Sequence, residues 1–415
     1  MKETIITGLD VGSTAIRIIV GQVFSEGAEN KLQILGAAEH PAEGIHRGSI
    51  TSIDDAAKSI SACLEKAERM AGVPVESAWV GISGAHIVSQ TTRGVVAVGK
   101  INGEIAKSDV ERALEAARTI AVPPNHEILH VIPRSSIIDG QISTKDPVGM
   151  TGSRLEVDAL VVQGFSSEIR NFTKCIYRSG LEIDDIVFSI LATAEAVLSN
   201  KQKELGVVLI NIGGSTTSIL IYEEGEILHT AVLPMGSDHI TSDIALGLQI
   251  SIDIAEKIKL EYASFGGKEN GKKEIQLEEL DASEQGTVSL RYVSQIIEAR
   301  VEEIFLKVEH ELKKIGRSGI LPGGAILTGG GSKLSGIIDI AKKQLKLPVA
   351  YAGVKNILNV IDRVYDQTFI PAVSIALWGL TSEQQKSRQV RGFISIDRTF
   401  DLRNRVKKLF KSLLP

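Results

Sequence analysis

The sequence has few aromatic residues, few cysteines and no excess of positive charge. Aromatic side chains make up 4% of its 415 residues, there are two cysteines, and the formal net charge is −5. A chain with this acidic balance is not expected to bind nucleic acid, which usually requires a basic face. Cys63 and Cys175 form no CxxC pair, so we expect buried thiols in a reducing compartment rather than a disulfide or a metal site.

Long apolar runs are also absent from the sequence. No stretch approaches the roughly 20 apolar residues that cross a bilayer as a helix. The first ten residues, MKETIITGLD, enter a strand-like run without the apolar region of a signal peptide. We therefore expect a protein of the cytosol, or one attached to a membrane from its cytosolic side. Its length predicts two to four domain-sized units.

Glycine is abundant, and two of its clusters occur in similar surroundings. The chain has 39 glycines; residues 9–14 read LDVGST, residues 210–215 read INIGGS, and apolar strand-like runs flank both. A repeated strand–glycine turn–strand unit predicts a duplicated fold whose halves face each other across a cleft.

Both repeated turns have the composition of a phosphate-binding loop. Backbone N–H groups of glycine and small hydroxyl residues can approach a phosphate chain closely. The predicted loop residues are Gly12, Ser13 and Thr14 in the first copy and Gly213, Gly214, Ser215 and Thr216 in the second. Asp10, at the end of the first strand, is predicted to hold Mg²⁺ through water. A tight hairpin turn would explain either loop alone, but the repetition favours phosphate binding.

A third glycine cluster lies between a predicted strand and a predicted helix. It contains Gly329, Gly330, Gly331 and Ser332. A helix N-terminus next to backbone without side chains can pack on a nucleotide. Close packing between the strand and the helix is the alternative.

The stretch between the two repeated turns has a different texture. Residues 84–163 combine short alternating strands with one predicted helix at 107–120, which indicates a small α+β module inserted into a larger α/β scaffold. Further along, residues 240–264 and 292–315 are predicted to be helical.

Three motifs, in this order and spacing, resemble those of the actin/Hsp70/sugar-kinase superfamily. GLDVGST, INIGGSTTS and ILTGGGSKLSG correspond to its first phosphate, second phosphate and adenosine motifs. IIDGQ at 137–141 and PVGM at 147–150, with Arg154 and Glu156, resemble the inserted 1C subdomain of the FtsA family, the bacterial cell-division actins. The segment AEKIK at 255–259 resembles the AExIK segment of bacterial actins, which implies that Glu256 and Lys259 contact the nucleoside. ATP and Mg²⁺ are thus the implied cofactors, and Arg17 is included in the predicted site.

This resemblance implies an α/β, actin-like, two-lobed duplicated ATPase fold, with an inserted small α+β subdomain and a C-terminal amphipathic helix. The expected units are lobe 1 at 1–83, the insert at 84–163, lobe 1 again at 164–198, lobe 2 at 199–245, a 2B subdomain at 246–318, lobe 2 again at 319–369, a return to lobe 1 at 370–381, a linker at 382–398 and the helix at 399–415.

Two departures from the superfamily pattern concern hydrolysis. Asn211 stands where many actin-like ATPases carry an aspartate, and an amide is neither a base nor a full charge for a metal. Leu191 and Ala192 occupy the positions of a Glu-Pro pair whose glutamate helps to position water. Asp10 is then the only clear carboxylate near the phosphates. We expect ATP to be bound and hydrolysed slowly or not at all.

The last residues predict a basic amphipathic helix. Its apolar members are Leu402, Val406, Leu409, Phe410 and Leu413, and its basic members are Arg403, Arg405, Lys407, Lys408 and Lys411. Such a helix after a polar linker is typical of an interfacial membrane anchor for anionic lipid. A terminal helix docked on the protein's own surface is the alternative.

The resemblance also implies a function. A member of this family polymerises, links the tubulin-like ring protein FtsZ to the inner face of the cytoplasmic membrane at the septum through a region near 246–318, and recruits later division proteins. Two alternatives remain: a pilus-assembly actin homologue that acts as a scaffold, and a sugar-kinase-type enzyme. The enzyme would need a carboxylate base aimed at its acceptor, and the sequence offers no clear candidate.

Overall fold

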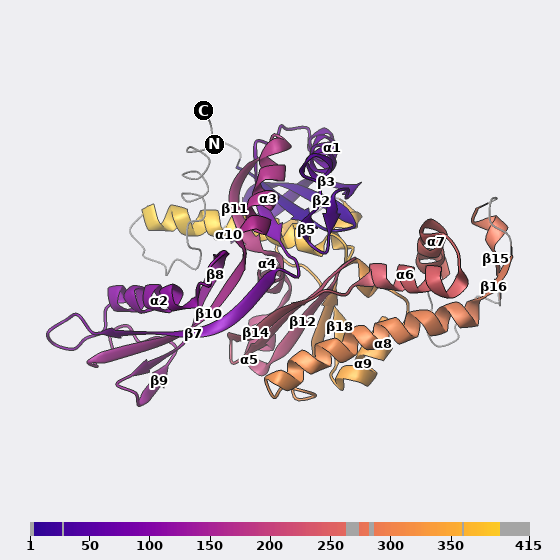
Figure 1. Ribbon diagram of the computed structural model, residues 1–415. Helices are drawn as coiled ribbons and strands as arrows, with labels where there is room; N and C mark the ends of the chain where they lie inside the picture. The colour runs from indigo at the N-terminus through magenta and orange to yellow at the C-terminus, as the bar shows by residue number, and fades with distance from the viewer. Residues whose placement is uncertain (1–3, 27–28, 263–273, 282–285, 359–360, 391–415) are drawn as a thin grey trace.

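The chain folds into two lobes with a projecting subdomain on each (Figure 1). The structure is a computed structural model, and it describes residues 4–26, 29–262, 274–281, 286–358 and 361–390. Helices alternate along the chain with the strands of two large sheets, so the fold is α/β as predicted.

Lobe 1 is built on a six-stranded sheet of order β11-β6-β1-β2-β3-β19. The strands are β1 (Ile5–Val11), β2 (Ala15–Glu26), β3 (Glu29–Pro41), β6 (Ser77–Ile82), β11 (Glu182–Phe188) and β19 (Ile357–Leu358). Its helices are α1 (Ile53–Ala71), α3 (Ser166–Arg178), α4 (Ser189–Val197) and α10 (Ile370–Val390), and β4 (Ile45–His46) pairs with β5 (Ser49–Ile50) beside them. The bounds of α1 follow from its caps, since the Ser52 hydroxyl accepts the N–H of Asp55 and Gly72 takes a left-handed conformation.

Lobe 2 repeats this strand arrangement. Its sheet has the order β14-β13-β12-β17-β18. The elements are β12 (Val207–Ile212), β13 (Thr217–Glu223), β14 (Glu226–Leu233), β17 (Ala325–Thr328), β18 (Val349–Tyr351), α5 (Asn200–Leu205), η2 (Gly330–Lys333) and α9 (Ile337–Leu345). β1 pairs antiparallel with β2 and parallel with β6, and β12 pairs antiparallel with β13 and parallel with β17. The duplication predicted from two short turns therefore extends over five strands of each lobe.

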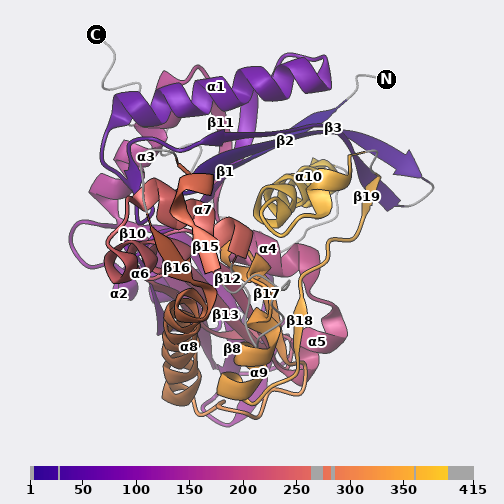
Figure 2. The ribbon, with the colours of Figure 1, turned by 90° about the vertical axis from the view of Figure 1, so that its right-hand side faces the viewer.

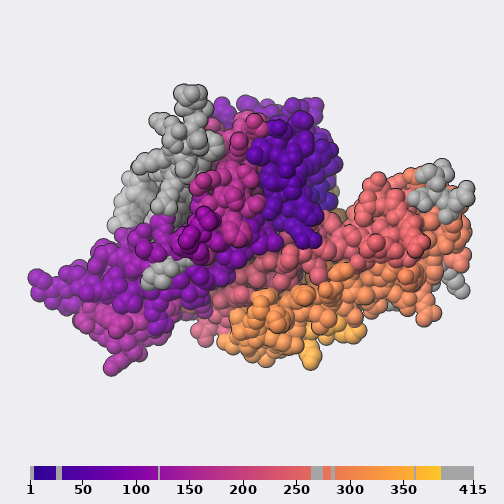
Figure 3. All heavy atoms as spheres, in the orientation of Figure 1, coloured from indigo at the N-terminus to yellow at the C-terminus, as the bar shows by residue number. Residues whose placement is uncertain are grey.

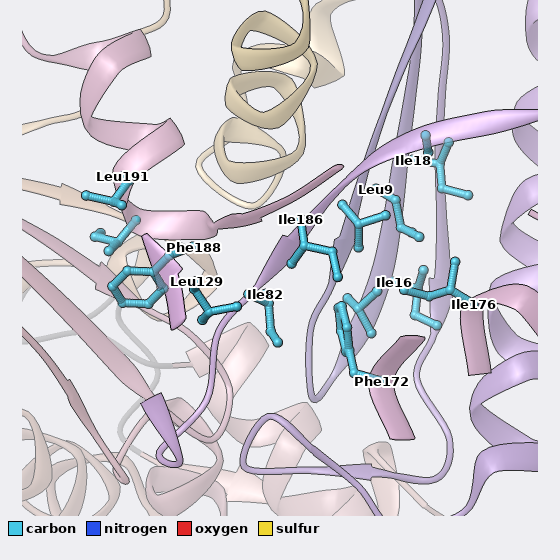
Figure 4. Packing of buried hydrophobic residues seen from close by; sticks show 14 of the residues in the cluster. Leu9, Ile16, Ile18, Ile82, Leu129, Phe172, Ile176, Ile186, Phe188 and Leu191 are labelled. Carbon is cyan, nitrogen blue, oxygen red and sulfur yellow. The ribbon is translucent and has the colours of Figure 1, made fainter. Parts of the chain in front are cut away.

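The core of lobe 1 lies between its sheet and the helices α1 and α3 (Figure 4). Ile16 and Ile18 of β2 are fully buried there, as is Ile176 of α3. Full burial of one such aliphatic side chain contributes about 1.5–3 kcal/mol. These alternating apolar positions fix which face of β2 points toward the helices.

Helix α10 covers the opposite face of the same sheet (Figure 2). A Cβ added to Gly8 would lie 2.6 Å from the carbonyl oxygen of Ala372 and from the amide nitrogen of Ala376. Only glycine lets the helix backbone pack this closely on β1. The last helix of the described chain is thus part of the core of lobe 1.

The inserted subdomain occupies residues between β6 and α3. It consists of β7 (Ile87–Ala97), α2 (Lys107–Ala121), β8 (His126–Ile138), β9 (Ile142–Thr144) and β10 (Arg154–Phe165), with sheet order β7-β10-β8-β9. A small core of its own includes Ile105, Val110 and Leu155. An inserted α+β module is what the sequence predicts at this place.

The second projecting subdomain lies at the other end of the molecule (Figures 1 and 3). It contains α6 (Ser237–Leu248), α7 (Ile252–Tyr262), β15 (Glu274–Gln276), η1 (Leu277–Glu279), β16 (Thr287–Ser289) and the long α8 (Leu290–Lys314). The stretch predicted as helical at 240–264 is two helices, because Gln249 adopts a left-handed φ of 57° and ends α6. The end expected for the second helix falls outside the described residues.

The C-terminal part departs from the expected linker. After η3 (Asp362–Tyr365), α10 continues to Val390, so the segment expected to be linker from 382 begins as helix. Glu, Gln, Lys and Arg between 383 and 388 are good helix formers, which accounts for the longer helix. The predicted membrane helix at 399–415 lies outside the described residues. Among the helices that are described, none combines the length and the apolarity that crossing a membrane would need.

Candidate functional site

The three glycine loops meet at one cavity between the lobes. It has a volume of about 540 Å³. The predicted residues that line it are Asp10, Gly12, Ser13, Thr14, Arg17, Asn211, Gly213, Gly214, Ser215, Thr216, Glu256, Lys259, Gly329, Gly330 and Gly331. A site assembled from segments more than 300 residues apart is therefore brought together by the duplicated sheets.

The first loop is the tight turn between β1 and β2. The Gly12 amide donates to the Ala15 carbonyl at 3.2 Å, and a Cβ on Gly12 would lie 2.7 Å from that oxygen. The Ser13 hydroxyl accepts the amide of Gly48 at 3.0 Å. These bonds hold the loop with its small side chains along the cavity wall.

The second loop repeats the hydrogen bond of the first. The Gly213 amide donates to the Thr216 carbonyl at 2.9 Å, which is the same three-residue spacing. A Cβ on Gly214 would lie 1.9 Å from Thr14 Oγ1, so this glycine lets the two loops approach each other. The amide of Ser237, in the first turn of α6, donates to the Gly213 carbonyl at 2.9 Å. The N-terminus of α6 is thereby fixed against the loop.

The third loop leaves β17 in a conformation that requires glycine. Gly329 has a φ of 87°, and a Cβ there would lie 2.3 Å from Asn211 Oδ1. Ser332 is the one predicted residue that does not line the cavity. It is fully buried, and its hydroxyl donates to the Gly329 carbonyl at 2.7 Å, so it holds the loop from beneath.

Glu256 and Lys259 line the cavity from α7. Lys259 is buried, and its Nζ lies 2.6 Å from Glu256 Oε2 and 2.9 Å from Thr241 Oγ1. A buried ammonium needs such partners, because an unpaired buried charge is strongly unfavourable. The pair therefore places a fixed polar edge at the α7 side of the cavity.

The charge balance at the first loop centres on Asp10. Burial raises the pKa of its carboxyl to about 6, and the nearby Arg17 guanidinium acts in the opposite direction. Arg17 is the cross-strand partner of Asp10, but its Nε bonds Glu39 at 2.7 Å. Arg17 thus lines the cavity while its charge is already paired.

A second carboxylate, not predicted from the sequence, lies beside the phosphate loops. Asp238, in the first turn of α6, accepts from Ser215 Oγ at 2.9 Å and lines the cavity. The expectation that Asp10 is the only carboxylate there is therefore wrong. An acidic residue at a helix start is a recognisable signal, but nothing in the sequence shows that this start abuts the second loop.

The start of α4 contributes no carboxylate to the cavity. Leu191 and Ala192 are buried in the core, and Ser189 is the residue of α4 that lines the site. Within the described ranges, no group of three or more histidine, cysteine, aspartate or glutamate side chains forms a metal site. A metal at this site would rely on Asp10, on water and on a ligand's own oxygens.

Two solved structures share the fold of this chain. A chain of a PilM-PilN type IV pilus biogenesis complex superimposes with a TM-score of 0.66 at 16% identity, covering 90% of this chain and 98% of that one. MreB5 of Spiroplasma citri bound to AMPPNP gives 0.55 at 13% identity, covering 92% and 99%. Together with the duplicated sheets around one cavity, this likeness defines an actin-like fold.

Sequence comparison identifies the family within that class. The family model described as "Cell division protein FtsA" matches residues 208–374, and that of the "SHS2 domain inserted in FTSA" matches residues 84–163. The chain belongs to the FtsA family of cell division proteins. FtsA of Pseudomonas aeruginosa is 36% identical over 379 residues, which cover 91% of this chain and 90% of that protein. FtsA of Bacillus subtilis is 38% identical over 358 residues, covering 86% and 80%.

Proposed function

We propose that this actin-like cell-division protein binds ATP with Mg²⁺ in the cavity between its lobes. The observation that carries the proposal is the convergence of both phosphate loops and the Gly329 loop on one cavity. The backbone amides of the loop residues that follow Gly12 and Gly213 suit phosphate oxygens, and the Glu256–Lys259 pair suits a nucleoside. The metal would neutralise phosphate charge, and Asp10 would orient its water.

Nucleotide binding is tested with the full chain and a fluorescent ATP analogue. Gly214→Ala is the informative variant, because its Cβ would overlap Thr14 Oγ1 and separate the loops. We expect at least a tenfold loss of affinity. Gly353→Ala is the control, since a Cβ there has no neighbour within 4 Å. Equal affinity of all three proteins would contradict the proposal.

Hydrolysis is proposed to be slow. Asn211 lines the cavity at the end of β12, and its amide offers neither a base nor a negative charge. Sustained turnover of several ATP per minute in a phosphate-release assay would contradict this proposal.

The proposed cellular role is to tether FtsZ filaments to the inner face of the cytoplasmic membrane at the septum. The supporting sequence is the basic amphipathic segment at 399–415. Pelleting with anionic vesicles compares the full chain with a version that ends at Arg398. We expect only the full chain to pellet, and the same result with both versions would contradict membrane attachment by this segment.

FtsZ is proposed to bind the subdomain formed by α6, α7 and α8. Leu246 of α6 is 78% exposed and Tyr292 of α8 is 47% exposed, and α6 packs on the helix that carries Tyr292. Exposed apolar side chains on neighbouring helices offer a docking surface for a short peptide. Tyr292→Ala should weaken binding of an FtsZ C-terminal peptide several-fold. Leu306→Ala, 14 residues further along the same helix, is the exposed control.

Self-association into filaments and recruitment of later division proteins complete the proposal. The insert and the α6–α8 subdomain project at opposite ends of the molecule (Figure 3). Two projecting ends of this kind allow head-to-tail contacts that repeat without closing.

A further inference from the structure

Asp238 connects the two phosphate loops through its carboxylate. Its position follows from the backbone: the amide of Asp238 donates to the Gly214 carbonyl at 2.8 Å, which fixes the first turn of α6 on the second loop. The side chain is therefore held at the meeting point of the lobes.

The carboxylate interacts with one hydroxyl from each loop. Oδ2 accepts from Ser215 Oγ at 2.9 Å, and Thr14 Oγ1 lies 3.4 Å from Oδ1. Ser215 belongs to lobe 2 and Thr14 to lobe 1. One anionic group thus takes hydrogen bonds from both halves of the duplicated fold.

Asp238 also lies close to Gly214, the glycine that lets the two loops approach each other. A Cβ built on Gly214 would lie 2.8 Å and 3.0 Å from the two carboxylate oxygens. All these groups line the same cavity. The carboxylate is thus next to the backbone and the hydroxyls that suit a phosphate group.

A phosphate and a carboxylate make the same demand on these hydroxyls. Each is an anion that only accepts hydrogen bonds, and a hydroxyl has one proton to donate. Two anions a few ångströms apart also repel each other, more strongly in a partly enclosed site than in water. Both the competition and the repulsion are greatest for the phosphate that reaches furthest between the loops.

We propose that Asp238 is a positioning residue that competes with the terminal phosphate of ATP for the hydroxyls of Thr14 and Ser215. The competition lowers the affinity for ATP relative to ADP, which lacks that phosphate. When ATP enters the cavity, its terminal phosphate therefore replaces Asp238 as the hydrogen-bond acceptor of these hydroxyls. The inference rests on the proposed nucleotide binding and adds a device that discriminates between nucleotides.

The test measures the Kd of fluorescent ATP and ADP analogues, with Mg²⁺, on the full chain. Asp238→Asn keeps the shape and loses the charge. We expect it to bind ATP about tenfold more tightly, which corresponds to about 1.4 kcal/mol, while the Kd for ADP changes by less than about twofold. Asp238→Glu keeps the charge and should stay near the wild type for both. Asp238→Ser supplies a second neutral variant if the asparagine variant does not fold.

The matched control is Asp253→Asn, an exposed position on α7 of the same lobe. It removes an equal charge away from the loops and should leave both affinities unchanged. Equal tightening by Asp253→Asn, equal tightening of ATP and ADP by Asp238→Asn, or weaker ATP binding by Asp238→Asn would overturn the inference. Weaker binding would identify Asp238 as a partner of the metal instead. Failure of the wild type to bind either nucleotide would overturn nucleotide binding itself, and this inference with it.

Discussion

At the scale of single residues, Asp10 combines a position on the cavity wall with an unfavourable environment. Its carboxyl is half-buried at the end of β1, and burial raises its pKa from 3.8 to about 6. A raised folded-state pKa means that ionisation opposes folding. The penalty is absent below pH 3.8 and complete above about pH 6.

We therefore expect Asp10→Asn to stabilise the fold while impairing the site. At pH 8 its free energy of unfolding should exceed that of the wild type by about 1–2 kcal/mol, after allowance for water in the cavity. The gain should vanish near pH 3.5, and binding of ATP with Mg²⁺ should weaken. Urea unfolding at the two pH values measures this effect. Equal free energies of unfolding for the variant and the wild type at pH 8 would show that ionisation of Asp10 does not oppose folding.

Asn211 is the residue at which a substitution should change ATP hydrolysis. Asn211→Asp should raise the rate of phosphate release from ATP, because a carboxylate restores charge at the end of β12. Asn211→Ala supplies neither the charge nor the hydrogen bond and should not raise it. A rate for Asn211→Asp no higher than that of the wild type would contradict the proposed role of Asn211 in limiting hydrolysis.

Local chemistry explains which site residues can be predicted from the sequence. The glycines and hydroxyl residues of the loops can be recognised in the sequence because close backbone approach requires small residues in a turn. Asp238 does not, since its role depends on which segments meet in space, and the sequence predicts Ser332 as a site residue but not its place beneath the loop. Asp238 faces a loop 23 residues earlier in the chain, and Ser332 turns under its own loop.

At the scale of elements, the joint between the insert and lobe 1 depends on a neutral histidine. His130 of β8 is fully enclosed, and its Nε2 accepts the amide of Phe188, the last residue of β11, at 2.9 Å. Burial lowers its pKa from 6.5 to about 4. Protonation would abolish the acceptor and leave a buried charge.

This joint makes the stability of the fold depend on pH. The unfolded chain takes up a proton below pH 6.5 while the folded chain does not, so stability is lost as the pH falls from 6.5 toward 4. Between pH 6.5 and pH 5 the wild type should lose about 1.5 kcal/mol more than His130→Gln, which keeps an acceptor. Chemical denaturation at each pH measures the free energy of unfolding. His46→Gln, at an exposed position, is the control. Parallel pH profiles of the wild type and His130→Gln would contradict the role of His130.

The boundaries of elements were less predictable than their kinds. The inserted module and the long helix follow from periodic apolar positions, and α2 and α8 begin and end within two residues of the predicted bounds. The break between α6 and α7 was not predicted because the residue that takes the left-handed conformation is Gln249, and glutamine does not normally signal the end of a helix. The extension of α10 into the expected linker shows that a polar composition alone does not end a helix.

At the scale of the whole molecule, the two projecting subdomains predict how copies assemble. Ile101, between β7 and α2 of the insert, is fully exposed. Ile101→Asp should shorten assemblies on a lipid surface, because a charge buried in a contact between copies has no partner. Ile320→Asp, an exposed position in lobe 2, is the control. Electron microscopy and sedimentation measure assembly, and filaments of normal length would exclude the tip of the insert as a contact.

The close packing of α10 on Gly8 has a consequence for synthesis of the chain. The strands of lobe 2, from β12 to β18, lie in one continuous segment, so this lobe can fold once residue 351 has emerged. Lobe 1 begins with the first strand but cannot bury that strand's second face until α10 is made some 360 residues later. At 5–20 residues per second this delay lasts roughly 20 to 70 s. During translation the first strands made are therefore among the last to be fully enclosed. The uncovered face of β1 would be the longest-lived binding site for a chaperone that shields nascent chains.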